Sequence, residues 1–179
     1  MSVTAGLGLS ENNIGRVLAS SGVLFAMFQY VVFRTINSKF GILLTMKIGL
    51  AVNIVSTVLI PVSSLLNGQK NKGEIPLPSF IFLTLVIAIQ KIFSCMFFAA
   101  ITIATNKTVP VEYRGTMNGF SMVGASLFKA LGPIAFGFTL SYLISSGVVL
   151  PLLGSFLTFF FISSFGVILL IYLGVVSFD

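Results

Sequence analysis

The stretch PVEYRGTMNGFSMVGASLFKALGP, residues 110–133, decides how this sequence folds. It passes from a short polar connection into an apolar segment with interspersed glycines, Lys129 near its middle and the pair Gly132-Pro133. In water this would be a poor helix, because each interior glycine costs about 1 kcal/mol relative to alanine and an interior proline about 3 kcal/mol. In a bilayer, glycines let helices approach closely, and neighbouring groups satisfy the carbonyl that proline frees. The stretch therefore predicts a transmembrane helix.

The composition of the whole chain supports a membrane protein. Of its 179 residues, 56% are hydrophobic and 8% are charged, and the mean hydropathy is +1.10, whereas soluble domains carry about 25% charged residues. The net charge of +6 comes from basic residues scattered singly between and within apolar runs. Because they form no basic patch, no nucleic-acid partner is expected. The expected partner is the lipid bilayer.

The chain lacks the residues that most enzymes and metal sites use. It has no histidine, one cysteine (Cys95) and four acidic residues, none of them deep in an apolar segment. No acid–base or nucleophile–base pair can be assembled from these groups, and no phosphate loop is present. We expect no enzyme activity, no catalytic residues, no cofactor and no metal.

Five apolar stretches are long enough to cross a bilayer, which takes about 20 residues per helix. The predicted fold is all-α, a polytopic membrane bundle of about five helices. A polar lead over 1–12 precedes it, and a tail over 177–179 follows. The bundle covers 13–176, with helices expected at 13–33, 40–65, 79–104, 117–143 and 149–176.

Basic residues in short loops predict the orientation, since such loops stay in the cytoplasm. One side carries Arg34, Lys39, Lys107 and Arg114, and the opposite side carries Arg16, Lys70 and Lys72. The bias predicts an outside or lumenal N-terminus and a cytoplasmic C-terminus. Residues Arg34, Lys39, Gly41 and Arg114 are assigned to the cytoplasmic turns.

Three stretches carry a resemblance to a known family. They are Leu9-Ser10 with Asn13-Ile14-Gly15, Gly22 and Gln29; Asn37-Ser38-Lys39-Phe40-Gly41; and Pro110 with Arg114-Gly115-Thr116, Asn118-Gly119 and Lys129-Ala130-Leu131-Gly132-Pro133. In order and spacing they resemble helices eight to twelve of a major facilitator superfamily transporter. The likeness is to the drug:proton antiporter branch that includes the zinc-induced facilitator-like proteins and their fungal relatives.

The resemblance implies part of the C-terminal half of a twelve-span fold, with the substrate site at the midplane between two halves. The chain is then expected to be a fragment or partial subunit of a transporter for small organic solutes, incompetent for transport on its own. A separate chain that supplies the missing helices is one implied partner. A non-transporting scaffold, a degenerate remnant and a truncated reading of a longer gene are the alternatives.

Five polar residues are candidates for lining a transport pathway: Lys129, Lys91, Gln90, Gln29 and Asn53. A lysine near the bilayer centre costs roughly 2.5–3.5 kcal/mol and usually faces a cavity or a partner. The two lysines could attract an anionic substrate, or they could bond to carbonyls or snorkel to the interface. The three amides could bind substrate or hold neighbouring helices together.

Small residues in the opening stretch are candidates for packing and bending. Gly115 and Gly119 have the GxxxG spacing, which favours close contact between membrane helices. Gly132-Pro133 is expected to bend its helix, either as a gating hinge or as a fixed shape.

Overall fold

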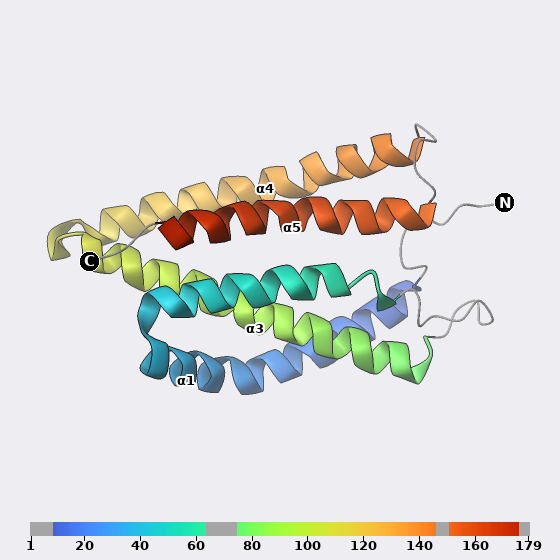
Figure 1. Ribbon diagram of the computed structural model, residues 1–179, viewed down its shortest axis with the longest axis horizontal. Helices are drawn as coiled ribbons and strands as arrows, with labels where there is room; N and C mark the ends of the chain where they lie inside the picture. Colours follow the sequence, from blue (N-terminus) through green and yellow to red (C-terminus); the bar gives the residue numbers. More distant parts are fainter. Residues whose placement is uncertain (1–8, 64–74, 146–150, 176–179) are drawn as a thin grey trace.

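A computed structural model describes residues 9–63, 75–145 and 151–175. Within these ranges every regular element is helical, which confirms the predicted all-α membrane bundle (Figure 1). The helices are α1 (Glu11–Leu59), α3 (Leu77–Thr108), the 3-10 turn η1 (Val111–Tyr113), α4 (Arg114–Ser145) and α5 (Pro151–Val175).

Helix α1 consists of two halves that reverse direction at Gly41. The first half begins after Ser10, whose Oγ accepts a hydrogen bond from the backbone N–H of Asn13 at 3.4 Å, as serine commonly does at a helix start. Gly41 has φ 73° and ψ 176°, a backbone conformation that is open almost only to glycine. One residue therefore makes the whole reversal, and the halves run antiparallel (Figure 1).

The reversal is sharper than the sequence predicted. A polar turn was expected over residues 34–39, yet the helix continues through Arg34, Asn37 and Lys39 up to Gly41. Polar side chains at the end of a membrane helix reach the headgroups without leaving the helix, so polarity alone did not locate the turn.

The connection between α3 and α4 is short. Val109 is extended (φ −111°, ψ 135°), as the residue before a proline prefers. Tyr113 N–H donates to the Pro110 carbonyl at 3.0 Å, and Arg114 Nε donates to the Val109 carbonyl at 3.3 Å. These bonds close the 3-10 turn directly onto the start of α4.

Some predicted features lie outside the described residues. They are residues 1–8 of the polar lead, most of the connection between the helices expected at 40–65 and 79–104, part of the connection between those expected at 117–143 and 149–176, and the tail over 177–179.

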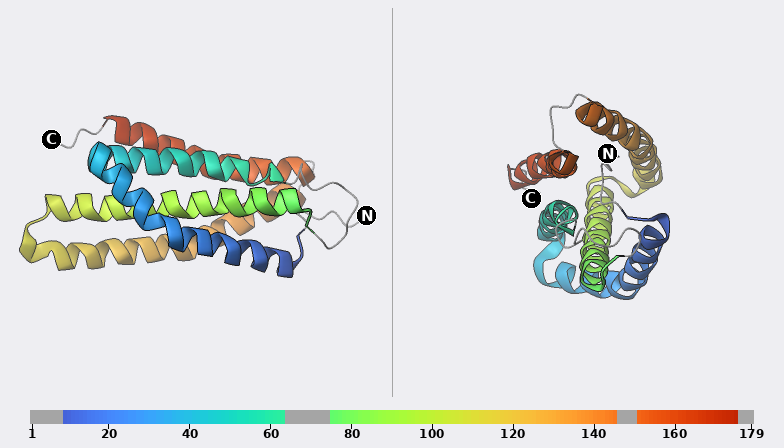
Figure 2. Two further views of the ribbon diagram at one scale, coloured as in Figure 1. Left: turned by 90° about the horizontal axis from the view of Figure 1, so that it is seen from below. Right: turned by 90° about the vertical axis from the view of Figure 1, so that its right-hand side faces the viewer.

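Helix α3 lies at the centre of the bundle, between the two halves of α1 (Figure 2, right). Helix α5 packs against the second half of α1, and α4 lies at the edge. The core joins the second half of α1 to α3 and α5 through Met46, Leu50, Phe97, Ala100 and Leu173.

Two of the described glycines permit close helix contacts. A Cβ on Gly49 would lie 3.1 Å from the Phe93 carbonyl oxygen and 3.2 Å from Met96 Cε, so α1 and α3 meet here almost backbone to backbone. A Cβ on Gly166 would lie 2.6 Å from Cγ1 of Ile54, where α5 meets α1. Such close approach between membrane helices is typical of small residues.

By length and composition, three stretches of the described residues could cross a membrane: Glu11–Leu59, Leu77–Thr108 and Val111–Thr139. The first of these contains both halves of α1, and a shorter apolar stretch, Phe159–Gly174, lies in α5. Large apolar side chains are exposed along all of them, for example Phe120 and Phe138, each 75% exposed. This surface fits contact with lipid acyl chains rather than water.

Candidate functional site

Lys91 ties α3 to the first half of α1. It is the fifteenth of the 32 residues of α3, so it lies near the middle of the helix. Its Nζ donates to Ser21 Oγ at 3.0 Å and to the Leu18 carbonyl at 3.4 Å. Ser21 is fully buried and also donates to the Leu18 carbonyl, at 2.9 Å. The ammonium carries three protons, and two of them have partners within the protein.

Gln90, the residue before Lys91, ties α3 to the second half of α1. Its Nε2 donates to Thr57 Oγ1 at 2.9 Å. Thr57 Oγ1 in turn lies 2.8 Å from the Asn53 carbonyl and 3.4 Å from Asn53 Oδ1. Two consecutive residues of α3 therefore hold the two antiparallel halves of α1 by polar contacts near mid-helix.

Two cavities lie beside these contacts and share one residue, Cys95. The larger, about 380 Å³, is lined by Phe25, Asn53, Gln90, Lys91, Ser94, Cys95 and Phe98. The smaller, about 170 Å³, is lined by Gln29, Tyr30, Phe33, Ile92, Cys95, Met96 and Ala99. The two cavities adjoin at Cys95 and lie between α3 and α1, mostly the first half of α1, with Asn53 of the second half lining the larger one. We call them together the α1–α3 groove.

Gln29 carries an unused acceptor in this groove. Its Oε1 is inaccessible to solvent and has no hydrogen-bond partner among the described residues. A buried amide oxygen without a donor costs about 1–3 kcal/mol, so such atoms often mark the place of an external donor.

The groove holds a cation without a counter-ion. Within the described ranges the carboxylate side chains are Glu11 and Glu112, and both lie at the ends of helices. Among these residues there is also no group of three potential metal ligands. The chemistry of the groove is therefore that of one ammonium, several amides and hydroxyls, and aromatic walls.

The structure brings four of the five predicted pathway residues together and leaves one apart. Gln29, Asn53, Gln90 and Lys91 line the groove. Lys129 lies exposed on α4 and lines neither cavity. Helix α4 runs through Pro133 as one helix, and the missing proline N–H leaves the Lys129 carbonyl without its usual intrahelical donor.

The predicted packing glycines of α4 face open space. A Cβ on Gly115, Gly119 or Gly132 would meet nothing within 4 Å. Their role in close helix packing stays a prediction, and it would require a partner beyond the described residues.

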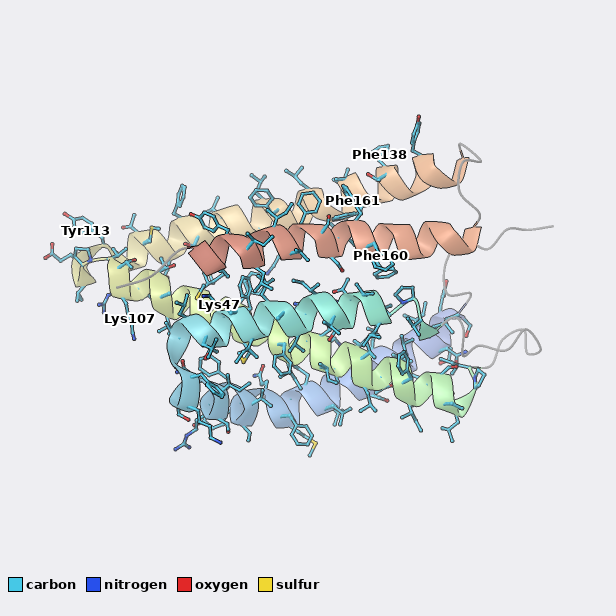
Figure 3. The ribbon with its side chains drawn as sticks, viewed as in Figure 1. Lys47, Lys107, Tyr113, Phe138, Phe160 and Phe161 are labelled. Atoms are coloured by element: carbon cyan, nitrogen blue, oxygen red, sulfur yellow. The ribbon has the colours of Figure 1, made fainter. Side chains whose placement is uncertain are left out.

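The residues assigned to the cytoplasmic turns lie toward one end of the bundle. The reversal at Gly41 and the start of α4 at Arg114 are at the same end (Figure 1). Lys107 and Tyr113 lie at this end, and Phe138 lies toward the other (Figure 3).

Sequence reasoning missed the residues that complete the groove. The missed residues Ser21, Phe25 and Phe33 recur every four residues together with the predicted Gln29, so the four form one stripe along α1. This spacing could have identified them as one face, although it does not say which helix the face meets. Phe98 and Cys95 lie on the matching face of α3.

Three transporters of Arabidopsis thaliana are similar to this chain over 137 residues. A probable peptide/nitrate transporter is 31% identical, and the proteins zinc induced facilitator-like 1 and zinc induced facilitator 1 are each 28% identical. The alignments cover 76% of this chain but only 26–27% of the length of each relative. No family model matches the chain, and no solved structure matches it.

These relatives are transporters of the major facilitator type, which are not enzymes. The predicted resemblance to the superfamily is thereby confirmed, as is the expectation that the chain is not an enzyme. The chain is an integral, multi-pass membrane protein and a distant homologue of major facilitator transporters.

Proposed function

We propose that this chain supplies part of the C-terminal half of a major facilitator transporter for small organic solutes, of the drug:proton antiporter branch and of fungal type. In this proposal it works only with further helices, which face α4. The observation that carries the proposal is the exposure of α4. This helix has a lysine at its middle, and no described residue of its most apolar stretch is buried.

A lysine at the depth of Lys129 supports the need for a partner. The residue is the sixteenth of 32 in α4, and it has no hydrogen bond or ion pair within the described part of the chain. A lysine facing lipid at the bilayer centre costs roughly 2.5–3.5 kcal/mol, whereas one that faces a water-filled pathway does not. Further helices beside α4 would enclose such a pathway.

Proton coupling is assigned to those further helices. Proton relays of pumps and transporters are built from Asp, Glu or His side chains within the membrane. The sequence has no histidine, and the described carboxylates, Glu11 and Glu112, lie at helix ends. The chain alone therefore does not drive coupled transport.

The orientation is part of the proposal. The reversal of α1 at Gly41 and the connection between Lys107 of α3 and Arg114 of α4 lie at one end of the bundle (Figure 1). Arg34 and Lys39 precede the reversal closely in sequence, so the basic residues gather toward this end, which supports a cytoplasmic location for it. The N-terminus is then outside or lumenal, and the C-terminus is cytoplasmic.

Co-expression with the first seven helices of the zinc induced facilitator-like 1 relative tests the proposal. We expect the two polypeptides to purify together. In pyranine-filled vesicles the pair, but not this chain alone, should show proton flux on addition of members of a panel of organic solutes. Solute-driven proton flux by this chain alone would overturn the proposed incompetence. Co-purification without flux for any solute would favour the scaffold alternative.

Variants on α4 locate the contact. Gly119→Leu should abolish co-purification if the open glycine face is the contact surface. Gly174→Leu is the matched control, because Gly174 on α5 also faces open space. Equal loss in both variants would contradict a role specific to α4.

A further inference from the structure

We infer that the α1–α3 groove binds an elongated organic anion, with its acidic group on Lys91 and a hydrogen-bond donor on Gln29. The inference rests on the proposed function, because it names the class of solute that the transporter would carry. It concerns binding by this chain alone.

The positive charge of Lys91, in the larger cavity, favours an anionic ligand. Lys91 Nζ uses two of its three protons on Ser21 Oγ and the Leu18 carbonyl, and its side chain lines the larger cavity. The third proton is free to bond a ligand. No carboxylate lines either cavity, so a carboxylate of the ligand would be the counter-ion that the ammonium lacks. Charge-assisted bonds of this kind are about twice as strong as neutral ones.

Gln29, in the smaller cavity, favours a ligand that carries a hydrogen-bond donor. Gln29 Oε1 is buried and accepts no hydrogen bond within the described residues. Gln29 lines the smaller cavity, so rotation of its amide would bring this oxygen to a hydroxyl or N–H of the ligand. A ligand without such a donor would leave the oxygen unpaired.

The spacing of the two ends sets the length of the ligand. Ser21, which holds Lys91, and Gln29 are eight residues apart on α1, or about 12 Å at 1.5 Å per residue. Phe25 lies between them in sequence and lines the larger cavity together with Phe98. Aromatic walls favour a flat apolar body, and the volume of the larger cavity is in the range of small-molecule sites.

Binding of 6-hydroxy-2-naphthoate tests the inference. This fluorescent probe carries a carboxylate and a hydroxyl at opposite ends of a flat body. The full chain in phosphatidylcholine nanodiscs should bind it saturably, and empty nanodiscs should not. The neutral analogue 6-hydroxy-2-naphthamide and the Lys91→Met variant should each weaken binding about tenfold to a hundredfold, the range of one charge-assisted hydrogen bond. Gln29→Leu should remove the preference for the probe over 2-naphthoate, which lacks the hydroxyl.

Control variants separate binding from folding. Lys91→Arg keeps the charge and should restore part of the binding that Lys91→Met loses. Lys107→Met, which removes a lysine at the end of α3, is the control and should leave binding unchanged. Cys95 is the chain's sole cysteine and lines both cavities, so the probe should slow its alkylation by N-ethylmaleimide.

Several outcomes would overturn the inference: binding no greater than to empty nanodiscs, an amide bound as tightly as the acid, or unchanged affinity in a folded Lys91→Met protein. Because no second polypeptide is present, failure here leaves the co-purification test of the proposed function untouched. Failure of co-purification likewise leaves this binding result standing.

Discussion

Helices α3 and α4 are each 32 residues long and each carries a lysine near the middle, yet their environments are opposite. Of the most apolar stretch of α3, 39% is buried, whereas none of the corresponding stretch of α4 is. Lys91 bonds to two oxygens of α1, while Lys129 is exposed. The comparison teaches that composition places a helix in the membrane, but only a neighbouring helix decides what its polar residues do.

The strongest test of the difference between α3 and α4 compares Gly49→Val, at the contact of α1 with α3, with Gly119→Val on α4. The new side chain at Gly49 would press on the Phe93 carbonyl oxygen, a backbone atom that cannot move aside. We expect Gly49→Val to lower the free energy of unfolding by up to about 3 kcal/mol, in the range of overpacked cores. Reversible unfolding in mixed micelles of dodecyl sulfate measures it. A Gly49→Val protein as stable as Gly119→Val would show that α1 and α3 are not in close contact.

The reversal in α1 should give the second largest effect. Gly41→Ala places a Cβ on a backbone with φ 73° and ψ 176°, a strain of about 1–3 kcal/mol. Gly22→Ala, in the first half of the same helix, is the control, because its Cβ meets nothing within 4 Å. The difference in unfolding midpoint between the Gly41→Ala and Gly22→Ala proteins checks the prediction. Identical midpoints would mean that the chain reverses without a positive φ at residue 41.

The polar contact between α3 and the second half of α1 should give a smaller effect. A double-mutant cycle of Gln90→Leu and Thr57→Val isolates the 2.9 Å bond. Its coupling energy should be about 0.6–1.7 kcal/mol, as measured for hydrogen bonds between membrane helices. Purely additive single effects would show that the bond does not stabilise the bundle.

The smallest effect is expected on α4. Lys129→Met should change the unfolding free energy of this chain by less than about 0.5 kcal/mol, since no described residue contacts the ammonium by a hydrogen bond or ion pair. The same unfolding experiment measures it. A change above about 1.5 kcal/mol would mean that α4 has an intrachain partner, and the contrast with α3 would fail.

The sequence predicted an all-α membrane bundle because hydropathy is a property of each segment alone. Apolar runs of this length have few alternatives to helix in a bilayer, where every backbone group needs a partner within the segment. The end of the first helix was less predictable. Polar residues such as Arg34, Asn37 and Lys39 are equally compatible with a loop and with the last turn of a helix. Only the backbone conformation of Gly41 shows that the helix continues through them.

The groove was predicted only in part, because its formation depends on how the helices rotate against one another. Gln29, Asn53, Gln90 and Lys91 stood out as polar residues in apolar runs. Ser21 and Thr57 did not, since hydroxyls of this size are common in membrane helices, where they bond to carbonyls of their own turn. Gly49 likewise could not be told from the other sixteen glycines, because its sequence neighbours do not reveal what faces it.

The joint at Gly41 also governs how this chain enters a membrane during synthesis. Only one residue, Gly41, separates the antiparallel halves. The connection is therefore too short for one half to insert into the bilayer while the other half stays at the membrane surface. The two halves must partition into lipid as a hairpin, and whichever way the first half points, the second is bound to the opposite direction. An insertion error at the first half would therefore invert the second half as well, rather than leave a single helix misplaced.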